Sequence, residues 1–440
     1  MGSTNSNGIN VGICGLGTVG GGVYELLTQT SALITARAGV PCHVVHLGMR
    51  NPKSAYDDGK ARISQDVLAV ARDPEVDVLV ELIGGTDTAR DLIEEALRQE
   101  KHVVTANKAL IAEHGNSLFA LADEHGVTLR YEAAVAGGIP IIKALREGLS
   151  GNEIEWLAGI INGTGNFILS EMFEKGREFA DVLAEAQALG YAEADPTFDV
   201  EGIDAAHKLA ILASIAFGMP LDMEAVFAEG ITALKPVDLN FAADLGYRIK
   251  HLGIARRGND GVELRVHPTL IPTTSLLASV NGVKNAVLVE GSAVGPTLYY
   301  GAGAGAKPTA SAVLADIVDI ARELAVGQTP CVPALGVTAD SLTAHAIVPM
   351  ARVETEWYLR LQAEDKPGVM SSITRLLSDQ GISIESLIQK PPAAGEQHVP
   401  VIVLTNAAAQ ENLEAAVQAM SALDTIAGEI VRIRVEPLDG

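Results

Sequence analysis

The stretch GYAEADPTFDVEGIDAAHKLAIL, from Gly190 to Leu212, places five carboxylates and then one lysine at the start of an apolar helical segment. Asp204 and Lys208 stand four residues apart, so a helix would present them on one face. Such groups can hold ions and exchange protons, whereas an exposed pair adds only about 0.2–0.5 kcal/mol to a helix. The structural alternative is that Asp199 caps the helix and Lys208 extends from it toward water. Both interpretations are open at this point.

A glycine-rich turn near the start of the chain predicts a dinucleotide site. In INVGICGLGTVGGGVYELLTQ a β-branched apolar run, a turn with G-x-G-x-x-G spacing and a helical pattern follow one another. This order lets a pyrophosphate approach the backbone at the positive end of a helix, although an ordinary glycine turn is the alternative. The residues expected to contact the cofactor here are Gly15, Leu16, Gly17, Thr18, Val19 and Gly20.

The second strand, CHVVHLGMR, decides between two cofactors. It ends in Arg50, where an NAD-preferring fold usually has an acidic residue for the ribose 2′-hydroxyl. Arg50, with Lys53, is suited to pair with a 2′-phosphate, so the sequence favours NADP over NAD, unless Arg50 is simply a solvated surface residue. A later turn, Gly301 to Lys307, contains Gly303 and offers backbone that could close on a cofactor.

Two further segments stand where ligands bind in a parallel α/β sheet. GGTD, which starts at Gly84, and TANK, which ends at Lys108, each follow a predicted strand. Ligands of such sheets bind beyond the carboxyl ends of the strands. Lys108 is therefore expected to point into the crevice beside a nicotinamide, or else to begin a helix as a solvated residue.

Alternating strands and helices indicate an α/β fold in three parts. Residues 1–132 are predicted to form a Rossmann-type parallel sheet, completed by the helix after residue 308, and residues 133–350 a second, α+β domain. Residues 351–440 have the order strand, helix, strand, strand, helix, strand, which is typical of a ferredoxin-like βαββαβ domain. No nucleophile with a base, metal cluster or phosphate loop stands in this last part.

Composition excludes several classes of partner. The 440 residues have a net charge of -23 and no basic stripe, which argues against nucleic acid and anionic membranes. No apolar run approaches the roughly 20 residues of a membrane span. The three cysteines, Cys14, Cys42 and Cys331, show no CxxC spacing, so we expect a cytoplasmic protein without disulfides or zinc.

Taken together, the motifs resemble the homoserine dehydrogenases that carry a C-terminal ACT domain, over nearly the whole chain. The motifs that carry the resemblance are GLGTVGGGV, ELIGG, TANKALIAEHG, YEAAVAGGIPII, INGTGNFIL and GYAEADPTFDVEGIDAAHKLAILA. Gly165 departs from the family pattern, which more often has a hydroxyl residue there; this should soften one contact near the nicotinamide. The resemblance implies NAD(P)-dependent interconversion of L-aspartate 4-semialdehyde and L-homoserine, toward threonine and methionine.

The resemblance also implies roles for individual residues. Lys208 becomes the proton donor to the aldehyde oxygen and Lys108 a second lysine at the reacting end, while Glu193, Asp199 and Asp204 hold the substrate or orient the lysines. It makes residues 133–350 the catalytic and oligomerisation domain of a homo-oligomer, a dimer or tetramer. A monovalent cation, sodium by expectation, is implied at Glu132, Val135, Gly137 and Ile139.

The last domain is expected to be a regulatory ACT domain with threonine as effector. Its strand-to-helix turn, with Asp365, Gly368 and Val369, could receive a carboxylate on backbone N–H groups. Two other functions stay open: a dehydrogenase for another amino-acid aldehyde or keto acid, and a catalytically silent amino-acid sensor that keeps the cofactor fold.

Overall fold

The computed structural model describes residues 8–57, 59–327, 332–389 and 398–438. The prediction concerning Cys331 lies outside these residues, whereas Cys14 and Cys42 are free thiols. Among the described residues, no helix is both long and apolar enough to cross a membrane.

The N-terminal domain is a six-stranded parallel sheet in the order β3-β2-β1-β4-β5-β6, which is the Rossmann order. Its strands are β1 (Ile9–Cys14), β2 (Cys42–Gly48), β3 (Arg62–Ser64), β4 (Val78–Glu81), β5 (His102–Thr105) and β6 (Leu129–Arg130). Its helices are α1 (Thr18–Gln29), α2 (Ser31–Ala38), α3 (Val67–Ala71), α4 (Asp87–Arg98) and α5 (Lys108–Glu124). Strands β1, β4, β5 and β6 are almost wholly buried because helices cover both faces of the sheet, whereas β3 and the start of β2 are more exposed.

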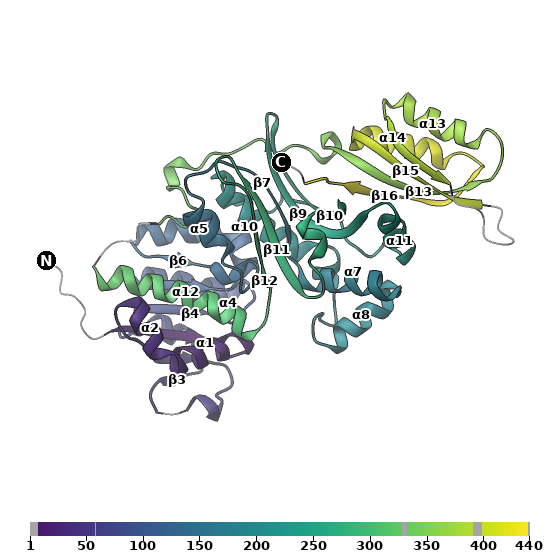
Figure 1. Cartoon of the computed structure of the whole chain (residues 1–440). Helices are drawn as coiled ribbons and strands as arrows, with labels where there is room; N and C mark the ends of the chain where they lie inside the picture. The colour runs from purple at the N-terminus through teal and green to yellow at the C-terminus, as the bar shows by residue number, and fades with distance from the viewer. Residues whose placement is uncertain (1–7, 58, 328–331, 390–397, 439–440) are drawn as a thin grey trace.

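A helix from much later in the chain completes this domain. Helix α12 (Ala306–Ala325) lies beside α1, in green against purple in Figure 1. The approach is close, because a Cβ added to Gly22 of α1 would lie 3.0 Å from the carbonyl oxygen of Ala306. Val313 and Ile317 of α12 belong to the same buried cluster as β1 and α1.

The central domain is built on antiparallel strands covered by helices. The strands are β7 (Ile154–Ile160), β9 (Tyr247–Gly258), β10 (Gly261–Pro272), β11 (Lys284–Gly291) and β12 (Gly295–Ala302), with short β8 (Phe227–Ala228) beside β10. The helices are α6 (Ile141–Lys143), α7 (Gly163–Lys175), α8 (Phe179–Ala188), α9 (Thr197–Val200), α10 (Ile203–Phe217) and α11 (Pro236–Asp244). Helix α10 is almost wholly buried, which explains its apolar sequence.

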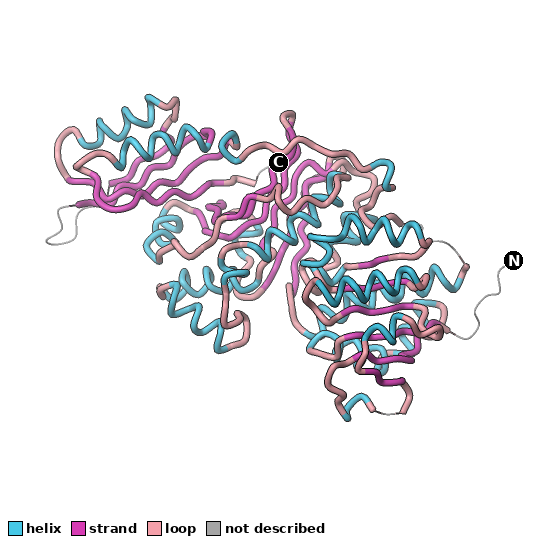
Figure 2. The backbone as a smooth tube through the Cα atoms, turned by 180° about the vertical axis from the view of Figure 1, so that it is seen from behind, coloured by secondary structure: helices cyan, strands magenta, loops and turns pink. Residues whose placement is uncertain are grey.

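The C-terminal domain has the predicted βαββαβ order. Its elements are β13 (Glu354–Glu364), α13 (Val369–Asp379), β14 (Ile384–Gln389), β15 (His398–Ala409), α14 (Gln410–Ser421) and β16 (Ile426–Val435). This sheet is continuous with the central one, because β16 pairs in parallel with β10. Figure 2 shows the strands running from the centre of the molecule into this domain.

The fold confirms the predicted α/β class, and the last strand of the N-terminal sheet is short. In VTLRYEAAV only Leu129 and Arg130 pair as β6, and a 3₁₀ turn begins at Glu132. The cause is local: the Glu132 carboxylate accepts hydrogen bonds from the backbone N–H groups of Ile142 and Lys143. These contacts bind the segment to the start of α6 rather than to the sheet.

Candidate active site

The glycine-rich turn has the geometry of a dinucleotide cradle. Gly15 has φ +95°, and a Cβ on Gly20 would lie 1.9 Å from the Gly15 carbonyl oxygen, so both positions require glycine. Around Gly17, in contrast, a Cβ would meet nothing within 4 Å, which leaves the backbone open to a ligand. The Lys53 ammonium donates to the Leu16 carbonyl at 2.9 Å and so fixes the turn. Arg50 is exposed two residues beyond β2.

The loops after β4 and β5 are held together by one buried carboxylate. Glu81 accepts hydrogen bonds from the N–H groups of Ile83 and Gly84 and from the hydroxyl of Thr105. Gly84 has φ +74° and open space at its Cβ position. Asn107 caps α5 by accepting from the Leu110 N–H, and the helix then starts with Lys108.

A cavity of about 660 Å³ lies where the N-terminal and central domains meet. It brings together residues from Ala106 to Thr309, and it gathers all of those predicted to act on the substrate. The predicted site residues among its lining are Lys108, Gly137, Glu193, Asp199, Asp204, Lys208 and Gly303. Lys108 comes from the N-terminal domain, whereas Lys208 comes from the buried helix α10.

Asp204 is the charged centre of this cavity. Its Oδ2 lies 2.6 Å from the Lys208 ammonium and its Oδ1 lies 3.0 Å from that of Lys108. Burial alone would raise the pKa of Asp204, but the ammonium groups of Lys208 and Lys108 outweigh it and lower the pKa to about 2. Lys208 also donates to the Ile161 carbonyl at 2.7 Å. Because an ammonium has three N–H donors, one donor of Lys208 remains for a substrate.

Asn162 was missed as a site residue, although it stands in a quoted motif. Its Oδ1 caps α7 by accepting from the Gly165 N–H, and its Nδ2 donates to Asp199 at 2.8 Å and to Asp204 at 2.7 Å. Burial raises the pKa of Asp199, and this hydrogen bond opposes the rise. An asparagine before a helical pattern signals a cap, but its reach to two carboxylates depends on the tertiary fold.

Glu193 differs from the other acids of the cavity. It is exposed on the segment that follows α8, and its carboxylate makes no hydrogen bond or ion pair with any residue described. Phe198, between Glu193 and Asp199 in the chain, lies 5.5 Å from the Lys108 ammonium. The cavity thus carries one unpartnered carboxylate near its mouth and two lysines bound to Asp204 inside it.

The segment expected to hold a cation is buried beside the cavity. Val135 and Gly137 are buried, and in the part of the chain described their carbonyl oxygens accept no hydrogen bond. Ala136 and Gly137 have φ +55° and +51°, and a Cβ on Gly137 would lie 2.5 Å from the Gly303 carbonyl oxygen. Ile139 follows in the same turn, and its carbonyl accepts from the Ile141 N–H. Burial, with the nearby Asp316, raises the pKa of Glu132 to about 8.

Several predicted residues do not line this cavity, among them Arg50, Gly84 and the two groups that follow. Gly17 and Thr18 of the glycine-rich turn line a separate pocket. In the C-terminal domain, Asp365, Gly368 and Val369 lie at the start of α13, where Gly368 has φ +93° and Asp365 accepts from Gln389.

The Rossmann order, the open glycine turn and a charged cavity at the domain junction define a nicotinamide dinucleotide-dependent oxidoreductase. The cavity lies beyond the carboxyl end of β5, where Ala106 and Lys108 line it, and such folds bind the reacting end of the cofactor beyond the carboxyl ends of their strands.

Comparisons with known proteins specify the family. Three protein-family models match the chain. The family model "Homoserine dehydrogenase" matches residues 140–318, the family model "Homoserine dehydrogenase, NAD binding domain" matches residues 15–132, and the family model "ACT domain" matches residues 357–425. Homoserine dehydrogenase of Pseudomonas aeruginosa is 57% identical over 431 residues, which are 98% of this chain and 99% of the relative. That of Neisseria gonorrhoeae is 49% identical with the same coverage.

A solved structure agrees with these matches. Homoserine dehydrogenase from Thiobacillus denitrificans superposes with a TM-score of 0.93 at 55% identity, covering 98% of this chain and 99% of that one. The chain belongs to the homoserine dehydrogenase family, with a C-terminal ACT domain, as its motifs indicated. The alternative of a catalytically silent sensor gains no support from these matches.

Proposed function

We propose that the chain interconverts L-homoserine and L-aspartate 4-semialdehyde at the cavity around Asp204. The observation that supports this most directly is the pairing of one buried carboxylate with two lysines from different domains. A nicotinamide cofactor held at this turn and cavity would supply or accept the hydride at the carbon that bears the reacting oxygen. The open turn at Gly17 fits the pyrophosphate of such a cofactor.

The residues of the chain then have separate tasks. Lys208 gives its proton to the aldehyde oxygen as that oxygen becomes an alkoxide, and takes the proton back in the oxidation of the alcohol. Asp204 fixes the direction of the Lys208 ammonium, and Asn162 fixes Asp204. Lys108 adds a second positive charge beside the developing alkoxide.

Glu193 is suited to bind the α-ammonium group of the substrate. Its carboxylate lines the cavity and has no partner among the residues described. Asp199 reinforces this negative end through its link to Asn162. A small zwitterionic amino acid thus finds carboxylates at one end of the cavity and ammonium groups at the reacting end.

The preferred cofactor is NADP rather than NAD. No carboxylate follows β2 at the position where an NAD-preferring fold carries one, and Arg50 stands there instead. Lys53 is engaged with the Leu16 carbonyl, so Arg50 is the group available for a 2′-phosphate. Gly84, Gly303 and the turn from Gly15 to Gly20 supply the backbone for the rest of the cofactor.

We also propose a sodium ion as a structural cation at Glu132, Val135, Gly137 and Ile139. The carbonyls of Val135 and Gly137 support this, because buried carbonyl oxygens normally have a partner and hard cations bind oxygen. If it binds there, replacing sodium by tetramethylammonium lowers the thermal unfolding temperature of the cofactor-free protein. An unchanged temperature would contradict the cation proposal.

Regulation by threonine is proposed for the turn of Asp365, Gly368 and Val369, in a homo-oligomer. The connection needed for it exists, since β16 of the C-terminal domain pairs with β10 of the central domain. Activity is expected to fall across a threonine titration, and a flat response would leave the domain an assembly element.

The reaction is tested by following reduction of NADP and of NAD at 340 nm with homoserine as substrate. Homoserine-dependent reduction, faster with NADP at equal concentration, is expected. Absence of reduction with both cofactors would contradict the proposed reaction.

A further inference from the structure

The loop that enters β11 is held by buried polar side chains of two other elements. Asn166 of α7 donates through Nδ2 to the carbonyls of Val280 at 3.1 Å, Gly282 at 2.9 Å and Lys284 at 3.2 Å. Lys250 of β9 donates to the Val280 carbonyl at 2.6 Å. Both side chains are nearly inaccessible to solvent. Because buried polar contacts of this kind fix the backbone, Lys284 has a defined position at the first residue of β11.

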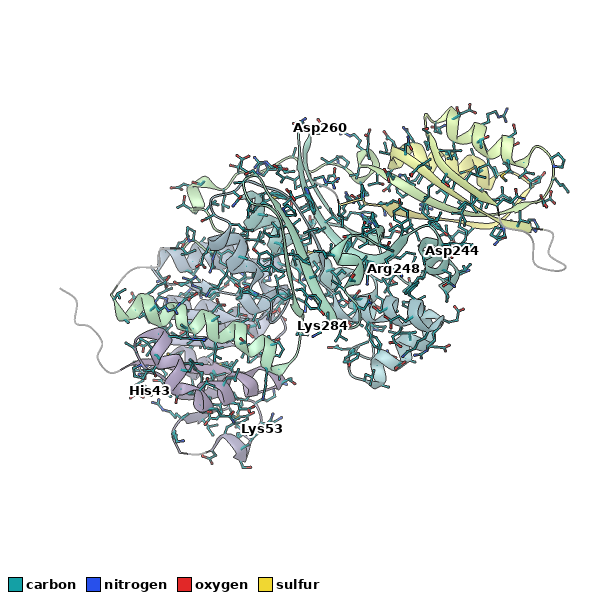
Figure 3. The ribbon with its side chains drawn as sticks, viewed as in Figure 1. His43, Lys53, Asp244, Arg248, Asp260 and Lys284 are labelled. Carbon is teal, nitrogen blue, oxygen red and sulfur yellow. The ribbon has the colours of Figure 1, made fainter. Side chains whose placement is uncertain are left out.

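Lys284 is a half-buried lysine that lines the same cavity as Lys208. Figure 3 shows it at the end of β11 and β12 that lies toward the N-terminal domain. Its ammonium has no hydrogen-bond or ion-pair partner among the described residues. The other two lysines of the cavity are bound to Asp204, so the unpartnered charges of the lining are one carboxylate, Glu193, and one ammonium, Lys284.

These two charges match the ammonium and carboxylate groups on the α-carbon of an amino acid. Neither group finds a pair within the described chain, and for the half-buried Lys284 this is costly, because a partly buried charge is unfavourable unless it is paired. The amino end of α7 also borders the cavity through Gly163 and Thr164, and its dipole favours an anion there. The cofactor turn at Gly17 lines a different hollow, which separates Lys284 from the pyrophosphate.

We propose that Lys284 binds the α-carboxylate of the substrate and so selects hydroxy amino acids over amino alcohols that lack a carboxylate. This inference rests on the proposed reaction, and it adds the group that recognises the anionic end of the substrate. Lys284 is a binding residue in this role and takes no part in the proton transfer assigned to Lys208.

The test removes the positive charge of Lys284 from the protein and, separately, the carboxylate from the substrate. Lys284→Met keeps the length of the side chain, and Lys284→Arg keeps its charge. Lys235→Met, at an exposed site before α11, is the matched control. Each protein is assayed by NADP reduction with homoserine and with 3-aminopropan-1-ol, which is homoserine without its carboxylate. Inhibition of homoserine oxidation by 3-aminopropan-1-ol and by 4-hydroxybutyrate, which keeps the carboxylate and lacks the amine, is measured alongside.

The ratio of kcat/KM for homoserine to that for 3-aminopropan-1-ol is expected to fall by about 10- to 100-fold in Lys284→Met. Lys284→Arg should retain most of the ratio, and Lys235→Met all of it. Inhibition by 4-hydroxybutyrate should weaken by a similar factor in Lys284→Met while inhibition by 3-aminopropan-1-ol stays unchanged, a readout that holds even if the amino alcohol is not turned over.

Equal losses with both substrates, or equal changes in both inhibition constants, would show that Lys284 serves the fold or the cofactor, and would overturn the proposal. Failure of the proposed reaction would be recognised differently, by the absence of homoserine oxidation in the unaltered protein. In that case Lys284 would also lose its assigned ligand.

Discussion

Replacing Asp204 by asparagine tests whether the two lysines of the cavity depend on one buried charge. The substitution keeps the size of the side chain but removes the negative charge that lies 2.6 Å from Lys208 and 3.0 Å from Lys108. Asn162 can still donate to the new amide oxygen. Two ammonium groups are then left close together without a compensating anion.

The pKa of Asp204 sets the size of the effect. It is lowered to about 2 from an ordinary value of 3.8, and a difference of one pH unit corresponds to about 1.4 kcal/mol. The ionised carboxylate therefore contributes about 2 kcal/mol to folding, and breaking a buried ion pair can cost about 3–5 kcal/mol. Because the folded-state pKa is depressed, this stabilisation is fully present above about pH 4 and disappears as the pH falls through about 2.

The assay is urea unfolding followed by the fluorescence of Trp156, which lies on β7 of the central domain, and of Trp357 in the C-terminal domain. Asp204→Asn should lower the free energy of unfolding by about 2–5 kcal/mol, with the same loss at pH 6 and pH 8. The control, Asp260→Asn at the exposed tip of the β9–β10 hairpin (Figure 3), should change it by less than about 0.5 kcal/mol. A loss no larger than that of the control, or one that varies between pH 6 and pH 8, would refute this account of the cavity.

Four other substitutions have distinct expected results. Gly17→Ala should weaken NADPH binding at least about 10-fold in a fluorescence titration without lowering the unfolding temperature. Gly20→Ala, whose Cβ would lie 1.9 Å from a carbonyl oxygen of the same turn, should instead lower the unfolding temperature. Equal effects of the two substitutions would contradict the proposed dinucleotide cradle. Arg360→Ala leaves the fully buried Asp238 carboxylate without the guanidinium that joins the C-terminal domain to α11. The free energy of unfolding in urea should therefore fall by about 3–5 kcal/mol. An unchanged urea midpoint would contradict this expectation. Arg50→Ala should raise KM for NADP about 10-fold and leave KM for NAD unchanged, and a parallel change in both would show that Arg50 does not discriminate between them.

The sequence predicts the parts of the site that depend on local patterns. The glycine spacing predicts the turn at Gly15, and the four-residue spacing predicts the pair of Asp204 and Lys208, because both depend on the geometry of a single element. The bond between Lys108 and Asp204 joins two domains, so no local pattern encodes it. The resemblance to the family implied that Glu193, Asp199 and Asp204 hold the substrate or orient the lysines, without assigning Lys108 to one of these acids.

Other features depend on tertiary contacts and were not predicted. Asn162 has the sequence signature of a helix cap, but its second function depends on where Asp199 and Asp204 fold. The parallel pairing of β16 with β10 joins two sheets that the sequence places in separate domains. This pairing could not be predicted, because the free edge of a strand does not specify its partner. Lys284 stands outside every motif quoted for the family resemblance, and only the cavity relates it to the other charges.

The role of Lys208 as proton donor is decided by the turnover of Lys208→Met with homoserine and NADP, together with NADPH binding by the same protein. If the Lys208 ammonium exchanges the proton with the substrate oxygen, kcat should fall by about 10²- to 10⁴-fold while the NADPH dissociation constant stays the same. Turnover equal to that of the unaltered protein, with unchanged cofactor binding, would contradict the claim.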